Sequence, residues 1–474
     1  MCAVTPVAYL PLPARTYRYI FVSMPEVAQL SAEPSGHLVA AWRADTPGCC
    51  SAEGGDLAHL NNAGAALVPA AVHGAVVGHL ERELRQGGYE AATAASAATR
   101  GVYESIAALI NAESPDTIAL VESATVAWDS FFYALPWRPG DVVLTTSVEY
   151  GANYVAYLHL AQKFLLEVRR LPNASDGAVD PSQVRAALEA CNGRCRLVAV
   201  THVPTNGGLV QPAEAIGAAI ADFNAAHCPT SSSTDDHGGA ASSSADCYRV
   251  HYLLDACQSV GQLPVDVQAL RCDALSATSR KYLRGPRGAG FLYVRLAALP
   301  PLLPPTIDHH AATWVAVDRY ELHGTARRFE KWEASAALRL GLGAAVDYAR
   351  RIGIDVIWTR VRWLAAYLRR GLASIAEVSL ADLGTVKCGI VTFTVQGWPA
   401  ADLQRALATA QPDGRRFNTT VSTDGATRVD MESRGLKAIN RASVHYYNTT
   451  HECDALIDAI RRVAQQAPPP SATS

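Results

Sequence analysis

Short apolar runs of strand type alternate with helical patterns along the middle of this chain. Six of them follow one another between residues 117 and 295, namely TIALVES, DVVLTTS, RLVAVTHV, YRVHYLLDA, CDALSAT and AGFLYVR. Several are too continuously apolar for half-exposed strands, and helical stretches such as PAEAIGAAIADFNAAH lie between some of them. This alternation predicts an α/β fold with a mostly parallel sheet covered by helices. Ligands of such sheets collect outside the carboxyl ends of the strands.

The sequence predicts two domains, an extension and a tail. Residues 1–40 have no regular period and form an N-terminal extension, and residues 467–474 form the tail. The large domain covers residues 41–305 and is interrupted at 227–247 by a Ser, Gly and Asp-rich insertion, which is predicted to be disordered because it buries too little apolar surface. Residues 306–466 carry helical patterns around a strand-like CGIVTFTV and form a smaller α+β C-terminal domain.

Composition excludes several classes of protein. With 474 residues, 49% of them hydrophobic and 18% charged, the chain can bury one large and one smaller core. A net charge of -3 gives no basic field for nucleic acid, and no apolar run is long enough to cross a membrane. Eleven scattered cysteines without a secretory signal favour reduced thiols and a cytoplasmic location. An organelle transit peptide within residues 1–30 stays open, because Arg15 and Arg18 precede the first acid, Glu26.

Three kinds of functional group fall at the ends of the predicted strands. ESAT closes one strand and precedes the helix-like WDSFFYAL, which is typical of an anion site at a helix N-terminus. Asp255 ends another strand, with Gln258 three residues later, and Lys281 follows a third. Pyridoxal 5'-phosphate (PLP) requires these parts: a lysine for the imine, an acid that keeps the ring nitrogen protonated, and a seat for the phosphate.

Each feature alone has an ordinary structural explanation. A strand-terminal Asp is often a helix cap, a Ser-Ala-Thr turn is often only a cap, and a lone lysine is usually solvated. Their joint order along one α/β chain favours the cofactor site.

The same segments resemble a known family. LDACQSVGQLPVDVQAL followed by SATSRKYLRGPRGAGFLYVR resembles the class V aminotransferase and cysteine desulfurase group of fold-type I PLP enzymes. The likeness extends from WRADTPGC and HLNNAGAALVP to RASVHYYNTTHECDALI, roughly residues 42 to 465. The resemblance implies the fold-type I architecture, PLP as cofactor, an amino-acid substrate, and a homodimer with the cofactor near the subunit interface.

The resemblance also implies roles for individual residues around the cofactor. Lys281 is implied to be the Schiff-base lysine, Asp255 the partner of the pyridinium nitrogen, and Gln258 a donor to the ring hydroxyl. The residues implied to surround the phosphate are Ala124, Thr125, Thr278 and Arg280.

Further implied roles concern the ring face, the substrate and the partner subunit. Tyr150 stands where desulfurases usually place a histidine stacked on the ring, and Thr205 matches a polar position beside the cofactor. Asn62 and Arg441 are implied to bind the substrate, Arg441 through its carboxylate. Thr313 is the candidate for contact with the partner's phosphate.

The departures from the family pattern bear on the reaction. Desulfurases carry a catalytic cysteine on a mobile loop, but RRFNTTVSTDGATRVDMESRGLKAIN contains none. Cys388 lies earlier and is expected to be an inert strand residue. Carbon–sulfur lyase or desulfurase-like elimination on a cysteine derivative is the first expectation, with transamination and isopenicillin-N-epimerase-like epimerisation as alternatives. A non-catalytic scaffold is disfavoured, because it needs neither Lys281 nor Asp255.

No metal site is expected. His309 and His310 are adjacent, as are His451, Glu452 and Cys453, and adjacent side chains diverge with no second ligand cluster at metal spacing.

Overall fold

The computed structural model describes residues 36–49, 57–228, 249–409 and 411–466. The predicted transit segment 1–30 and tail 467–474 therefore lie outside the described residues. The same holds for residues 1–35 of the predicted extension 1–40 and for residues 229–247 of the predicted insertion 227–247. Residues Glu33–Ser474 form one compact unit. The predicted domain boundary after residue 305 stays a prediction.

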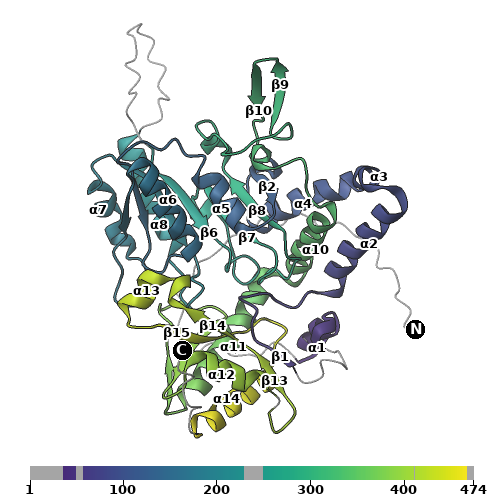
Figure 1. Cartoon of the computed structure of the whole chain (residues 1–474), viewed down its shortest axis with the longest axis vertical. Helices are drawn as coiled ribbons and strands as arrows, with labels where there is room; N and C mark the ends of the chain where they lie inside the picture. The colour runs from purple at the N-terminus through teal and green to yellow at the C-terminus, as the bar shows by residue number, and fades with distance from the viewer. Residues whose placement is uncertain (1–35, 50–56, 229–248, 410, 467–474) are drawn as a thin grey trace. The chain divides into compact units, whose positions relative to one another are not determined.

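A seven-stranded sheet organises the first two thirds of the described chain (Figure 1). Its strands, in spatial order, are β2 (Ile118–Val121), β8 (Gly290–Val294), β7 (Ala274–Thr278), β6 (His251–Asp255), β5 (Cys195–Thr201), β3 (Val142–Thr145) and β4 (Glu167–Arg170). The strands from β7 to β4 are parallel, whereas β8 runs antiparallel to both β7 and β2. The α/β fold with a mostly parallel sheet is therefore confirmed.

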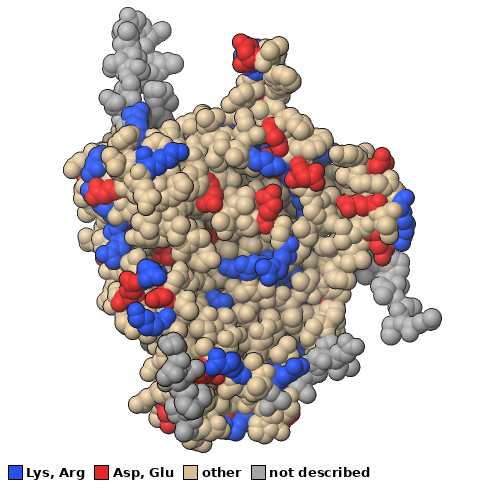
Figure 2. Space-filling view, in the orientation of Figure 1, with Lys and Arg blue, Asp and Glu red and all other residues tan. Residues whose placement is uncertain are grey.

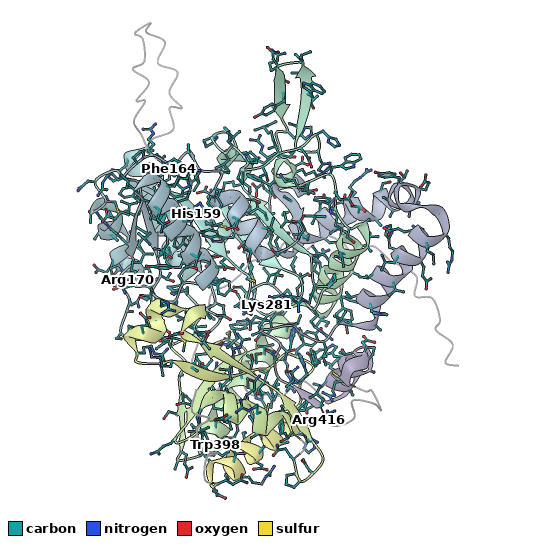
Figure 3. All side chains as sticks on the ribbon, viewed as in Figure 1. His159, Phe164, Arg170, Lys281, Trp398 and Arg416 are labelled. Carbon is teal, nitrogen blue, oxygen red and sulfur yellow. The ribbon has the colours of Figure 1, made fainter. Side chains whose placement is uncertain are left out.

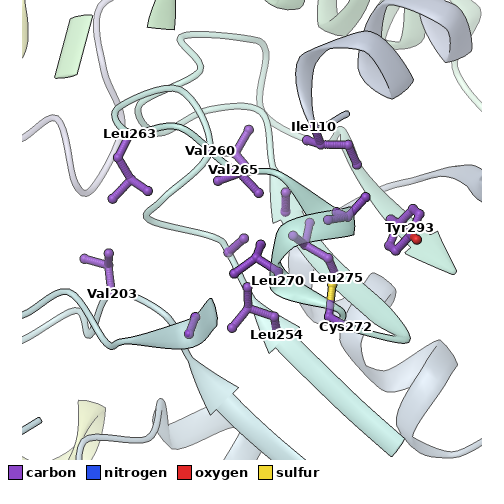
Figure 4. Packing of buried hydrophobic residues seen from close by; sticks show 14 of the residues in the cluster. Ile110, Val203, Leu254, Val260, Leu263, Val265, Leu270, Cys272, Leu275 and Tyr293 are labelled. Carbon is purple, nitrogen blue, oxygen red and sulfur yellow. The ribbon is translucent and has the colours of Figure 1, made fainter. Parts of the chain in front are cut away.

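Helices cover both faces of this sheet. They are α2 (Ala70–Gln86), α3 (Gly88–Ala94), α4 (Ser96–Leu109), α5 (Ala124–Phe132), α6 (Gly151–Phe164), α7 (Val184–Glu189), α8 (Ala213–His227), α9 (Val267–Leu270) and α10 (Ala336–Ile352). Consecutive strand residues enter different cores: Leu253 packs in one cluster with Trp128, and Leu254 in another with Ile216. Figure 4 shows Leu254 beside Leu275 in the second cluster. Burial on both faces explains why the strands are continuously apolar.

A second sheet lies in the C-terminal part of the chain. It is antiparallel, in the order β11 (Val378–Leu380), β12 (Ile390–Val395), β15 (Ala438–Ser443) and β14 (Thr420–Thr423). The helices in this part are α11 (Ile354–Ala373), α12 (Ala400–Ala408), α13 (Arg428–Ser433) and α14 (Thr450–Ala464). Apolar residues of α11, α12 and α14 share one buried cluster with β12, which gives this α+β part its own core.

Shorter elements complete the structure. Helix α1 (Gly36–Ala44) precedes β1 (Leu57–His59), which pairs in parallel with β13 (Arg416–Asn418). The hairpin of β9 (Ala312–Ala316) and β10 (Arg319–Leu322) stands out from the sheet (Figure 1).

Basic and acidic side chains are interspersed on the face of the molecule drawn in Figure 2. None of the helices among the described residues is both long and apolar enough to span a membrane. Six of the described cysteines are free thiols, namely Cys191, Cys195, Cys257, Cys272, Cys388 and Cys453, whereas Cys228 is disulfide-bonded.

Candidate active site

A pocket lies at the carboxyl ends of the parallel strands. It is open to solvent, and the empty space between its walls, open solvent included, is ≈ 580 Å³. Its lining contains most of the residues predicted for the site, namely Ala124, Thr125, Tyr150, Thr205, Asp255, Gln258, Thr278, Arg280 and Lys281. Figure 3 shows Lys281 between the seven-stranded sheet and the C-terminal strands.

The strand register explains why these residues meet. Thr201 at the end of β5 is the register partner of Asp255 at the end of β6, and Asp255 is in turn the partner of Ser276 on β7. Lys281 follows three residues after the end of β7 at Thr278. Because parallel strands end at one edge of a sheet, acid and lysine come to the same place.

Asp255 is a buried carboxylate inside this pocket, with 6% of its surface exposed. One oxygen accepts a hydrogen bond from the backbone N–H of Cys257 at 2.9 Å, and the other accepts one from Nδ2 of Asn153 at 3.0 Å. Burial raises the pKa of Asp255, while these two hydrogen bonds and the positive charge of Lys281 oppose that rise. A buried acid of this kind needs a cationic partner to remain ionised.

The loop that carries Lys281 is held by a buried arginine. Arg284 adopts a left-handed backbone with φ of 62° and is 1% exposed. Its side chain donates hydrogen bonds to the carbonyl of Leu67 at 2.8 Å and to the hydroxyl of Thr46 at 2.6 Å, and its guanidinium lies 4.4 Å from the ring centre of Tyr447. Arg284 therefore anchors the lysine loop, a role that its place in a basic cluster did not reveal.

The N-terminus of α5 faces the same pocket. Ser123 caps this helix by accepting a hydrogen bond from the N–H of Val126 at 3.1 Å, and Ala124 and Thr125 form the first turn. Strand β8 passes close by: a Cβ atom at Gly290 would lie 3.3 Å from the nitrogen of Ala124 and 2.5 Å from the carbonyl oxygen of Ala277. Free N–H groups at a helix N-terminus favour an anion.

Arg441 lies behind Thr205 at the edge of the pocket. Its Nη1 donates hydrogen bonds to the carbonyl oxygen of Thr205 at 3.0 Å and to the hydroxyl at 2.8 Å, and Nη2 lies 3.4 Å from Oδ1 of Asn61. Burial lowers the pKa of Arg441 to about 10, and its buried Nε has no hydrogen-bond partner. No carboxylate in the described part of the chain forms an ion pair or hydrogen bond with it. A buried cation without an acid is suited to an anionic ligand.

Two polarisable side chains line the pocket together with Lys281. Tyr150 precedes α6 and is 37% exposed, and burial together with nearby Cys257 and Asp255 raises the pKa of its phenol. The thiol of Cys257 also lines the pocket. Burial raises the pKa of Cys257, whereas the charge of Lys281 and a hydrogen bond with it lower that pKa. Cys257 was missed in the sequence because it is a single cysteine, between Asp255 and Gln258, without a second cysteine at a recognisable spacing.

Besides Arg441 at its edge, two predicted residues, Asn62 and Thr313, do not line the pocket. The side chain of Asn62 is fully buried: Nδ2 donates to the carbonyl of Ser443 at 2.7 Å and to Oδ1 of Asn448 at 3.1 Å, and Oδ1 accepts from Tyr447. These contacts use both hydrogens of the Asn62 amide and one lone pair of its oxygen, so its binding to a substrate stays a prediction. Its neighbour Asn61 is the residue that reaches Arg441. Thr313 is exposed on β9, so its contact with a partner subunit stays a prediction.

Further pocket residues were not predicted from the sequence. Asn153, Thr201 and Val203 line the pocket, and Asn153 stands four residues after Glu149 on the first turn of α6. Among the described residues no group of three or more His, Cys, Asp or Glu side chains could hold a metal ion.

Comparisons with known proteins agree with this geometry. The family model described as aminotransferase class-V matches residues 58–234 and 241–456. A cysteine desulfurase of Dickeya dadantii is 30% identical over 430 residues, covering 87% of this chain and 93% of the relative.

Solved structures share the fold. The apo structure of a cysteine desulfurase from Thermococcus onnurineus NA1 has a TM-score of 0.76 at 22% identity and covers 90% of this chain and 98% of its own. The cystine C–S lyase C-DES, in complex with its reaction product cysteine persulfide, has a TM-score of 0.69 at 23% identity, with 86% and 98% covered.

Proposed function

The chain belongs to the aminotransferase class-V family, and from this membership we propose that it is a PLP-dependent enzyme that breaks a carbon–sulfur bond in a cysteine derivative. The observation that carries the proposal is that Lys281 and Asp255 line one pocket, and that Arg441 at its edge has no acidic partner among the described residues. Relatives named cysteine desulfurase and a structural neighbour named cystine C–S lyase support the carbon–sulfur chemistry.

The pocket fits PLP by the chemistry of its donors. The first turn of α5, with Thr278 and Arg280 on the same pocket wall, offers donors for a phosphate. Asp255 offers a buried carboxylate for a protonated ring nitrogen. Gln258 has a buried Oε1 without a hydrogen-bond partner among the described residues, which leaves this oxygen free to accept a hydrogen bond, while Nε2 donates to the carbonyl of Ala63 at 3.1 Å.

Bound PLP would supply an electron sink for the electron pair left on the α-carbon of the substrate. Arg441 binds the substrate carboxylate in a planar, two-pronged contact that Thr205 orients from behind. The amine of Lys281 accepts the α-proton as general base, and Tyr150 contributes a flat aromatic ring to the pocket lining. Loss of the β-sulfur group then gives a thiol-type product, with pyruvate and ammonia after addition of water.

The segment between β13 and β15 supports elimination over transfer of sulfur to a loop cysteine. It contains no cysteine, and it packs against the pocket: Nδ2 of Asn206 donates to the hydroxyl of Thr427 at 2.6 Å. A Cβ at Gly151, next to Tyr150, would lie 2.5 Å from the carbonyl oxygen of Gly425. The segment between β13 and β15 therefore supplies no thiol that could attack the sulfur of a substrate.

Product analysis tests this proposal. The PLP-loaded protein is incubated anaerobically with cysteine S-conjugates and ordinary amino acids, with and without a keto-acid acceptor. Pyruvate and ammonia in equal amounts without an acceptor support elimination. A keto acid that forms only with an acceptor would replace it by transamination, and loss of optical activity alone would replace it by epimerisation.

We propose further that the enzyme is a homodimer. The β9–β10 hairpin exposes Trp314 (75%), Val317 (94%) and Tyr320 (48%), and such an apolar projection suits a second copy of the chain. Thr313 lies on the same hairpin and is the proposed contact with the partner's phosphate site. A cytoplasmic location is proposed as well, supported by six free cysteines among the described residues, although Cys228 is disulfide-bonded.

A further inference from the structure

A second buried carboxylate lies beside the pocket, on the far side of Asn153 from Asp255. Glu149, in the turn between β3 and α6, is 3% exposed. Five donors converge on it: its Oε1 accepts from the N–H of Tyr150 at 2.9 Å, from Nδ2 of Asn153 at 2.9 Å and from the hydroxyl of Thr201. Its Oε2 accepts from the hydroxyls of Thr145 at 2.7 Å and Tyr157 at 3.3 Å. A surface first-turn acid has no such shell.

One amide group links this carboxylate to the pocket. The two hydrogens of Nδ2 of Asn153 are divided between Oε1 of Glu149 at 2.9 Å and Oδ2 of Asp255 at 3.0 Å. The position of Asn153, and through it one oxygen of Asp255, therefore depends on Glu149. Glu149 also fixes the backbone of Tyr150, where α6 begins.

The two carboxylates also interact through their charges. Like charges held close in a buried site raise each other's affinity for protons, and Asp255 is among the groups that raise the pKa of Glu149, after burial as the main cause. The titratable groups that face this pair are Tyr150 and Tyr157 on or beside α6, Cys257 after β6, and Lys281 after β7. Of these, only Lys281 carries a positive charge.

We propose that Glu149 is a positioning residue of the active site. Through Asn153 it holds Asp255 toward the cofactor, and its negative charge helps the bound cofactor to keep its proton. The inference rests on the proposed PLP-dependent function and deepens it. Glu149 touches neither substrate nor cofactor, so its effect passes through Asp255. The neutral replacement Glu149→Gln tests the charge of Glu149 with little change in shape. The amide oxygen of the glutamine can accept from the three donors that Oε1 has in wild type. Its amide nitrogen can donate to the hydroxyls of Thr145 and Tyr157, because a hydroxyl also accepts hydrogen bonds.

The main readout is the pH titration of the visible absorption of the PLP-loaded protein, which does not depend on turnover. In Glu149→Gln the bound cofactor should lose its proton about one pH unit lower than in wild type. The kcat should fall about tenfold, as is typical when a supporting residue is lost, with KM within about twofold. Glu149→Asp, which keeps the charge, should return the titration most of the way to wild type.

Tyr157→Phe is the matched control, because it removes one hydrogen bond to Glu149 and leaves both the charge and Asn153 in place. Its titration should match wild type. If Glu149→Gln does not fold, Asn153→Leu breaks the same link and should weaken PLP binding about tenfold. Wild-type titration and PLP affinity in both Glu149→Gln and Asn153→Leu would overturn the inference. A wild-type protein without a PLP absorption band would instead overturn the proposed function.

Discussion

Arg441 donates hydrogen bonds to both oxygens of Thr205, at 3.0 Å to the carbonyl and 2.8 Å to the hydroxyl. Arg441 belongs to β15 of the C-terminal sheet, whereas Thr205 follows β5 of the seven-stranded sheet. These hydrogen bonds therefore join the two sheets at the pocket, and they fix the orientation of the guanidinium before a substrate binds. Pre-orientation of this kind reduces the entropy lost when a carboxylate binds.

Arg441→Lys should raise KM for the amino-acid substrate by about tenfold to a hundredfold, because a point charge replaces a planar pair of charge-assisted hydrogen bonds. The PLP absorption band should remain, since Arg441 is not assigned to the cofactor. Steady-state kinetics and the visible spectrum of the same preparation measure both effects. Arg428→Lys, at an arginine whose side chain is 63% exposed, is the control and should leave KM unchanged. An unchanged KM in Arg441→Lys would remove Arg441 from the substrate site.

Asp255→Asn should reduce kcat at least about tenfold while the protein stays folded. The amide has the size of the carboxylate but no charge, so a ring nitrogen beside it loses its proton more easily and accepts electrons less well. Turnover and thermal unfolding of the variant are the measurements. Wild-type turnover with PLP bound would show that another group protonates the ring.

The residues at strand ends were predictable, whereas those that support them were not. Asp255 and Lys281 each end or follow a continuous apolar run, and the parallel sheet brings such ends together. Glu149 precedes a helix, where an isolated acid usually lies in solvent near the helix N-terminus. Only the folded chain shows that Thr145 and Thr201 surround it. A Glu and an Asn four residues apart at a helix start, as in SVEYGANY, are the signal that could have been used.

Long-range contacts explain the other differences. The resemblance pointed to Asn62 as a substrate ligand. In the structure its amide contacts Tyr447 and Asn448, which are far away along the chain, and its role toward a substrate stays a prediction. An apolar run also does not indicate whether a strand is parallel or antiparallel to its neighbours. The antiparallel direction of β8 could therefore not be predicted from AGFLYVR. Thr313 was assigned to a partner contact, and its exposed position on a hairpin leaves that assignment to experiment.

Acid should destabilise the protein through two buried histidines. Burial lowers the pKa of His202 and of His251 to about 4, from an ordinary value of 6.5. Between these pH values the two histidines bind protons in the unfolded chain but not in the folded chain. Their contribution to the free energy of unfolding is therefore fully present above pH 6.5 and is lost as the pH falls toward 4, by up to about 3 kcal/mol per histidine.

Urea unfolding at pH 7 and pH 4.5 measures this loss. His251→Gln should lose less stability than wild type between the two pH values, because it has one fewer buried titrating group. His73→Gln, at an exposed histidine, should behave as wild type. Equal losses in wild type and His251→Gln would contradict the assignment of the acid effect to His251.

The β9–β10 hairpin should hold two copies of the enzyme together. Trp314→Asp combined with Val317→Asp should shift the protein toward monomer in sedimentation at micromolar concentration and lower its retention of PLP, because an apolar interface does not tolerate unpaired charge. Leu84→Asp, at a residue 85% exposed on α2, is the control. A wild-type monomer that is active and retains PLP would contradict the homodimer and the role of Thr313.

Covalent trapping tests most directly whether Lys281 is the lysine that holds the cofactor beside Asp255. The chain has only five lysines, Lys163, Lys281, Lys331, Lys387 and Lys437, so the labelled position can be assigned without ambiguity. The PLP-loaded protein is reduced with borohydride, digested and mapped by mass spectrometry, alongside Lys281→Ala. The account predicts the pyridoxyl group on Lys281 in wild type, no label in Lys281→Ala, and a folded variant without turnover. A label on another lysine, or wild-type turnover in Lys281→Ala, would contradict it.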